Sequence, residues 1–310
     1  DTQWQNAGTV RNTGVELALN WHDAIGKDFN YGINWNMACN SNKVTAINNA
    51  NHYNEGGKDL LSQNTGTMSR MEEGHPIGYF YGYKTAGVMQ NAADIQQYLK
   101  ENCSGDATKS LQGTDIKPGD LKFVDVNGDG VIDANDKTEI GSPHPDVTMG
   151  LGFNVGYKGF DLSVTTYAAL GQEVMRSWRK FTDGQHENYT TEVYKYWHGE
   201  GTSNKYPRLA PGNTGPNWQQ VSDIYVEDAS YFRLQNLTLG YDFKNVWKNC
   251  PFQQLRLYFS AQNLFTITGY DGMDPENGMA LNGSEPWVTG VDVGNYPSPR
   301  TFLVGVNVKF

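Results

Sequence analysis

The chain has 310 residues and carries 24 Lys and Arg against 34 Asp and Glu, a formal net charge of −10. This acidic balance, without a run of basic residues, excludes an ordinary nucleic-acid-binding surface. The mean hydropathy of −0.61 and the lack of an apolar stretch of about 18 residues exclude a helical membrane protein. The high content of Gly (35), Tyr (18), Phe (13) and Trp (8) is typical of a β-barrel that faces lipid on one side and water on the other.

Apolar and polar residues alternate in about seven segments, which is the pattern of strands with two different faces. The short Lys158-Gly159 sequence predicts a tight turn between two of them, and a phase slip near Asn236 predicts a bulge. The expected strands cover 15–22, 29–37, 147–155, 160–164, 231–243, 255–265 and 302–310.

Short and long connections alternate along the chain, so the two ends of the predicted sheet differ. The connections at 23–28, 158–159 and 244–254 are short, whereas those at 39–146, 171–230 and 266–300 are long. Outer-membrane barrels have short periplasmic turns and long extracellular loops. A soluble sandwich can also alternate, but its outward face is polar. Here the apolar face carries large side chains, namely Trp21, Trp35, Phe153, Phe259 and Phe310.

We therefore expect an all-β fold, an antiparallel transmembrane β-barrel. Single-chain barrels have an even number of strands and no free edge, so seven strands predict that earlier strands are missing from this chain. The last strand is expected to turn Phe302, Val304, Val306, Val308 and Phe310 to lipid and Asn307 and Lys309 to the lumen.

Segments along almost the whole chain resemble the C-terminal part of SusC-like (SusC/RagA-type) TonB-dependent transporters. Seven or more such matches in order and at compatible spacing are specific, whereas any one alone is weak. The matching segments cover 8–17, 119–130, 140–146, 157–163, 206–209, 226–234, 260–265 and 296–302.

The resemblance implies outer-membrane import of oligosaccharides or peptides through a plugged, 22-stranded barrel. Residues 1–310 would be the C-terminal part of that barrel, and 39–146 a large extracellular loop region. Implied partners are the remainder of the barrel, membrane lipid, a SusD-like surface lipoprotein and the TonB complex, reached through the missing N-terminal part. The alternative is a secreted, calcium-stabilised, β-rich binding protein without a membrane role, which would not depend on detergent.

The segment 125–136 has the register of a calcium-binding loop, in which positions 1, 3, 5 and 12 supply side chains and position 7 a carbonyl. Gly130 stands at position 6. At position 12 Asp136 replaces the usual Glu, and its shorter side chain extends less far toward the ion. The alternative is an Asx-rich turn whose side chains bond their own backbone. The candidate ligands are Asp125, Asn127, Asp129, Val131 and Asp136.

The sequence offers no catalytic motif: its six His residues lack metalloprotease spacing, and neither a nucleophile elbow nor a Walker loop occurs, so no enzyme is expected. Four loop tryptophans, Trp178, Trp197, Trp218 and Trp287, could stack on a substrate or simply pack the loops. The three cysteines form no C-x-x-C pair. Cys39 and Cys103 fall on the predicted outer side, which allows a disulfide, whereas Cys250 falls in a periplasmic turn.

Overall fold

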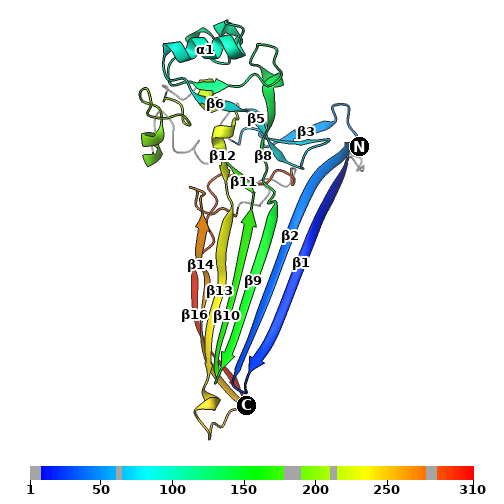
Figure 1. Ribbon diagram of the computed structural model, residues 1–310, viewed down its shortest axis with the longest axis vertical. Helices are drawn as coiled ribbons and strands as arrows, with labels where there is room; N and C mark the ends of the chain where they lie inside the picture. The colour runs from blue at the N-terminus through cyan, green and yellow to red at the C-terminus, as the bar shows by residue number, and fades with distance from the viewer. Residues whose placement is uncertain (1–7, 61–64, 178–189, 210–214, 277–284) are drawn as a thin grey trace, which may run out of the picture.

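The computed structural model describes residues 8–60, 65–177, 190–209, 215–276 and 285–310. Its largest element is a seven-stranded sheet whose neighbouring strands are all antiparallel (Figure 1). All seven expected strands are confirmed. In order across the sheet they are β1 (Gly8–Ile25), β2 (Phe29–Ile47), β9 (Val147–Tyr157), β10 (Phe160–Leu170), β13 (Tyr231–Asp242), β14 (Gln254–Thr268) and β16 (Thr301–Lys309).

The two faces of the sheet differ in polarity, as the alternation predicts. One face, the apolar face, carries exposed Leu19, Trp21 and Leu151, and Trp21 is 60% exposed. Leu19 and Leu151 both pair with Trp35, which places all three side chains on the same face. The opposite, polar face carries Asn and Gly residues at the intervening positions, so the sheet has the polarity of a wall between lipid and water.

Glycine on the polar face makes room for longer neighbours. A Cβ at Gly150 would lie 2.9 Å from the amide oxygen of Asn36, and one at Gly156 would lie 2.7 Å from the Asn30 amide. A Cβ at Gly305 would lie 2.4 Å from the Tyr258 ring. These close approaches explain part of the unusual glycine content.

The short connections all lie at one end of the sheet, the lower end in Figure 1, together with the C-terminus. Lys158 and Gly159 both have positive φ, 47° and 90°, as the predicted tight hairpin turn requires. The predicted bulge is confirmed as well, since the pairing of β13 with β14 shifts register between Leu234 and Asn236.

Two predicted boundaries were wrong. The strand expected to end near residue 37 continues as β2 to Ile47, and its partner β1 begins at Gly8. The expected loop region 39–146 therefore begins with nine residues of sheet, 39–47. The alternation fades there because polar residues such as Asn40, Ser41 and Asn42 occupy both faces.

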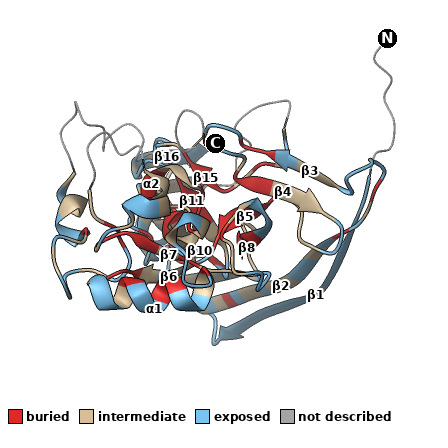
Figure 2. Cartoon of the chain, turned by 90° about the horizontal axis from the view of Figure 1, so that it is seen from above, coloured by how far each residue is buried: buried red, intermediate tan, exposed pale blue. Residues whose placement is uncertain are grey.

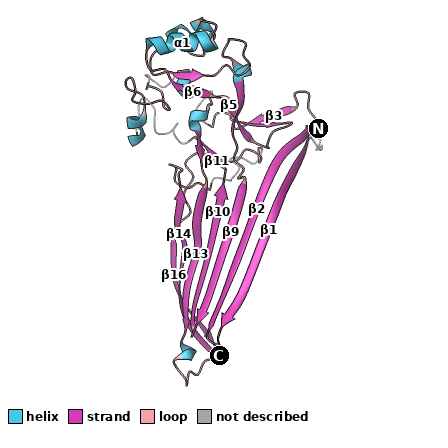
Figure 3. Cartoon of the chain, in the orientation of Figure 1, coloured by secondary structure: helices cyan, strands magenta, loops and turns pink. Residues whose placement is uncertain are grey.

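The long connections fold together at the other end of the sheet into one body, which we call the loop body: the described parts of 48–146, 171–230 and 269–300. Figure 3 shows helices in this body and in the turn at the opposite end, but none in the seven long strands. Its elements are β3 (Tyr53–Gly56), β4 (Ser69–Glu72), β5 (Tyr79–Tyr83), β6 (Thr85–Val88), α1 (Ala92–Asn102), β7 (Leu121–Phe123), β8 (Lys137–Gly141), β11 (Glu173–Arg176), α2 (Pro216–Gln219), β12 (Val226–Asp228) and β15 (Val291–Asp292). Short 3₁₀ turns cover Ala107–Lys109, Gly113–Asp115, Ala134–Asp136, Thr191–Lys195 and Asp223–Tyr225, and a sixth, Phe243–Asn245, lies in the turn after β13.

One hydrophobic core joins all three long connections. Phe80 and Phe123 come from the first connection, Tyr196 and Trp218 from the second, and Val291 from the third, and all belong to one buried cluster. Figure 2 shows buried segments gathered in the loop body, whereas β1 is exposed along its whole length. The loops are therefore a folded unit that holds the sheet's upper end in place.

Within the described ranges, no helix is long and apolar enough to cross a membrane.

Candidate functional site at the upper end of the sheet

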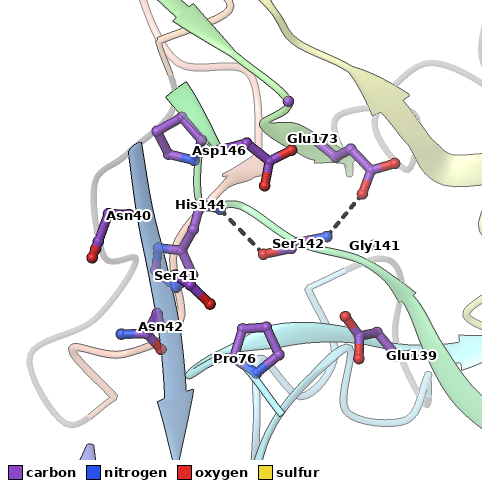
Figure 4. Close-up of a pocket in the computed structure, with 12 residues that line it drawn as sticks. Asn40, Ser41, Asn42, Pro76, Glu139, Gly141, Ser142, His144, Asp146 and Glu173 are labelled. Carbon is purple, nitrogen blue, oxygen red and sulfur yellow. Dashed lines mark hydrogen bonds between the residues drawn. The ribbon is translucent and has the colours of Figure 1, made fainter. Parts of the chain in front are cut away.

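A polar cavity of about 400 Å³ lies where the sheet meets the loop body (Figure 4). We call it the junction cavity. Its lining comes from the end of β2, the approach to β9, the end of β8 and the start of β11. The polar side chains that line it are Asn40, Ser41, Asn42, Glu139, Ser142, His144, Asp146 and Glu173.

The strand register places this cavity on the polar face. Cys39 of β2 pairs with Val147 of β9, and both continue the odd-numbered series of the apolar face. Asn40 and Asp146 are each one residue away, so their side chains project from the opposite face. Asp146 also lies against Gly171, where a Cβ would come within 2.3 Å of its carboxylate, and Gly171 has a φ of +83°. Glycine at 171 is thus required both by the backbone and by the space that Asp146 occupies.

Hydrogen bonds hold the cavity wall in a fixed shape. The backbone N–H of Ser142 donates to the Glu173 carboxylate at 2.8 Å. His144 Nε2 lies 2.7 Å from the carbonyl oxygen of Ile77, and the N–H of Ile77 donates to Asn42 at 2.8 Å. These contacts tie the segment after β8 to the end of β2.

The cavity is acidic. Glu139, Asp146 and Glu173 supply three carboxylates, and the described lining contains no Lys or Arg. Burial raises the pKa of Glu173, and the nearby carboxylates of Asp228, Glu139 and Asp146 raise it further, against the lowering effect of the Ser142 hydrogen bond. The ionised form of Glu173 is therefore disfavoured in this cavity, and a cation placed beside it would favour ionisation.

A second cavity, of about 510 Å³, shares Glu139, Gly141 and Glu173 with the first. In it, His75 Nδ1 lies 2.6 Å from a carboxylate oxygen of Glu139, so this carboxylate has a local partner. Lys84 and Asp223 also line the second cavity.

The sequence of this chain is similar to those of known proteins. The chain is 32% identical over 314 residues to the TonB-dependent receptor P3 of Formosa agariphila, a match that covers all of this chain and 30% of the relative. It is 30% identical over 311 residues to the TonB-dependent receptor SusC of Bacteroides thetaiotaomicron, covering 99% of this chain and 27% of that protein. The chain is thus similar over its whole length to TonB-dependent receptors, one of which is named SusC. It spans about 30% of the length of these relatives.

The fold is also similar to that of a solved structure. The solved structure of the RagAB peptide transporter superposes on the whole of this SusC-like chain with a TM-score of 0.70 at 23% identity, over 30% of that chain. The expected barrel-wall fold is thereby confirmed. No family model matches the chain. The relatives are receptors rather than enzymes, in agreement with the expectation for this chain.

The predicted calcium loop of this SusC-like chain lies in the loop body, after β7. The Asp125 carboxylate accepts N–H bonds from Gly128 at 2.6 Å and Gly130 at 2.7 Å. The fully buried Asp136 carboxylate accepts from Val126 at 2.9 Å and from Asp133 at 2.8 Å. Asp129 accepts from the N–H of Val131 at 2.9 Å, and Asn127 from that of Asp129 at 2.9 Å.

The donor types in this loop suit calcium, but the side chains are engaged with the loop's own backbone. Among the described residues, no group of three or more His, Cys, Asp or Glu converges in a way that could hold a metal. Calcium binding therefore stays a prediction.

The three described loop tryptophans pack against the loop body. Trp218 is only 8% exposed, lies 5.0 Å from the Tyr196 ring and donates its indole N–H to the Arg208 carbonyl. Trp197 and Trp287 are partly buried against the same core. This geometry favours the packing alternative over substrate stacking for these three, and Trp178 lies outside the described residues.

The disulfide that the sequence allows between Cys39 and Cys103 does not form in this structure, in which all three cysteines are free. Cys39 lies on β2, in register with Val147, whereas Cys103 caps the C-terminus of α1 in the buried core. The sequence positions of the two cysteines do not show whether their sulfur atoms lie close together in the fold.

The junction cavity was missed in the sequence because its polar residues come from four separate segments. The only local signal was the sequence Ser142-Pro143-His144-Pro145-Asp146, which places three polar side chains just before a strand.

Proposed function

We propose that this chain is part of the wall and outer loops of an outer-membrane TonB-dependent importer of oligosaccharides or peptides. The observation that carries the proposal is the whole-chain similarity to TonB-dependent receptors, including one named SusC. The two-faced sheet supports it, because a wall with an apolar face and a polar face suits a barrel in lipid. The similarity to TonB-dependent receptors gives no support to the alternative of a secreted binding protein.

The partners follow from the same proposal. The importer would couple to the TonB complex, and a SusD-like surface lipoprotein would cover the loop body. The remainder of the barrel would pair with β1 and β16, each of which has a single neighbouring strand among the described residues. The solved structure with a similar fold is that of the RagAB peptide transporter.

A structural calcium ion is a second part of the proposal. Asp125, Asn127, Asp129, the Val131 carbonyl and Asp136 would hold it, and its charge would balance the carboxylates of this loop. Support comes from the ligand types and their spacing in the sequence.

Growth of the source organism tests import. Deleting the gene for the full-length protein should abolish growth on one class of nutrient, in a panel of single glycans and peptide mixtures as sole carbon source. The wild-type gene should restore growth, and a version without the TonB-coupling segment should not. Unchanged growth on every nutrient would contradict the proposal.

A further inference from the structure

We infer that the junction cavity recognises a protonated amine on the imported molecule. This inference rests on the proposed function, since it assigns a ligand class to a cavity on the polar face of the wall. The same chemistry occurs in peptides, as a terminal amine or a lysine side chain, and in amino sugars.

The position of the cavity makes it accessible to a substrate. Asn40 and Asp146 project from the polar face, at the end of the sheet where the loop body begins. A molecule entering from the loop side along the polar face therefore passes this cavity. Its volume of about 400 Å³ accommodates a side chain or one sugar ring rather than a whole oligomer.

The chemistry of the lining selects for positive charge. Asp146 and Glu173 both line the junction cavity, and the negative charge of Asp146 contributes to the raised pKa of Glu173. The Glu173 carboxylate receives a neutral backbone N–H from Ser142, which leaves its charge uncompensated by that contact. An ammonium group placed between Asp146 and Glu173 would be attracted to both carboxylates, whereas a carboxylate there would be repelled.

Neutral groups in the same cavity complete a site for an amine-bearing ligand. Asn40 and Ser142 line the space with an amide and a hydroxyl group that can both donate and accept hydrogen bonds. A purely acidic patch would bind any cation, but this mixed lining also suits the carbonyls or hydroxyls next to an amine. Glu139 is paired with His75, so the two remaining carboxylates carry the selectivity.

The test uses the purified full-length protein in detergent and two pairs of probes. One pair is an eight-residue peptide with three lysines and a free N-terminus, and the same peptide with glutamine in place of the lysines and an acetylated N-terminus. The other is the glucosamine trimer and its N-acetylated form. Wild-type protein should bind the charged member of at least one pair more tightly than the neutral member, and the pair that discriminates identifies the source of the amine.

The double variant Asp146→Asn/Glu173→Gln should reduce this preference about fivefold, as expected for the loss of two partly screened charge pairs. The matched control, Glu101→Gln/Asp115→Asn, removes the same charge from exposed sites in the loop body and should keep the wild-type preference. Equal binding of charged and neutral probes by wild-type protein, or equal loss in both double variants, would overturn the inference.

Failure of the proposed function would look different. An amine preference that depends on Asp146 and Glu173, in a protein whose deletion changes growth on no nutrient, would leave the site intact and remove the import role. Growth that depends on the gene, in a protein with no amine preference, would support the import role and contradict the amine site.

Discussion

Arg256 on β14 reaches across β13 to pair with Asp161 on β10, with 2.8 Å between its Nε and a carboxylate oxygen. The pair lies over Gly240, where a Cβ would come within 2.5 Å of both side chains. Three strands of the wall are thus joined on the polar face by one ion pair that only glycine allows.

Gly240→Ala should therefore destabilise this part of the wall by about 1–3 kcal/mol, because the added methyl group forces the pair apart. The measurement is the heat-induced mobility shift of the full-length barrel on gels. Gly152→Ala is the control, since a Cβ there meets its nearest neighbour at an ordinary 3.6 Å. If both variants unfold at the wild-type temperature, the pair does not brace the wall.

Arg233 should hold the segment 269–276 onto the wall. Its guanidinium, 5% exposed, bonds Asp274 at 2.5 Å, Glu276 at 2.7 Å and the Thr266 hydroxyl at 3.0 Å. Arg233→Gln leaves the Asp274 carboxylate without its cation, which costs about 3–5 kcal/mol for a buried pair. Hydrogen exchange of 269–276 should rise strongly.

The control for this prediction is Lys195→Gln, which removes the exposed ion pair between Lys195 and Asp271 of the same segment. An exposed pair contributes less than about 1 kcal/mol, so exchange should barely change. Equal effects of the two variants would show that burial of Arg233 has no role.

Acid should release the same segment. Burial opposes ionisation of Asp274, but N–H bonds from Ser298 and Glu276 and the charge of Arg233 outweigh it, so the pKa of Asp274 is lowered. A lowered pKa in the folded state means that the contribution is complete above the ordinary carboxyl value of about 3.9 and is lost as the pH falls below it. A fluorophore at Met273→Cys should report release only below that value, and release near pH 6 would contradict this account.

Much of the wall could be predicted because each strand carries its own alternating pattern. The turn at Lys158-Gly159 and the bulge near Asn236 also left local signals, in turn chemistry and in a broken period. The loop body left no such signal: Phe80, Tyr196 and Val291 share a core but are over 90 residues apart, and no periodicity records their contact. The junction cavity could not be predicted either, because its lining residues also come from segments far apart in the sequence.

Trp218 should act as a core residue of the loop body. Trp218→Ala removes a buried indole and should cost about 3–5 kcal/mol, seen as faster hydrogen exchange in 190–209 and 215–225. Tyr194→Ala, at a side chain that is 80% exposed, is the control and should leave exchange unchanged. A Trp218→Ala protein with wild-type exchange but weakened ligand binding would instead favour the substrate-stacking role.

Calcium should bind the loop 125–136 with a stoichiometry of one. Terbium luminescence of the full-length protein, displaced by calcium, measures it, and Asp125→Ala should abolish the signal because position 1 supplies both a ligand and the bonds to Gly128 and Gly130. Asp115→Asn, outside the loop, should keep it. The same signal in all three proteins would leave the loop as an Asx-rich turn.

The most direct test of the central claim, that this chain forms a wall between lipid and a polar interior, is the accessibility of neighbouring residues on β16. Val306 is exposed and pairs with Leu257 on the apolar face, while Asn307 pairs with Arg256 on the polar face. Nitroxide labels are placed at Val306→Cys and Asn307→Cys in full-length protein without its native cysteines, reconstituted in a bilayer. The account predicts frequent collisions with oxygen and few with a water-soluble nickel complex at 306, and few oxygen collisions at 307. High accessibility to the nickel complex at 306 would contradict it.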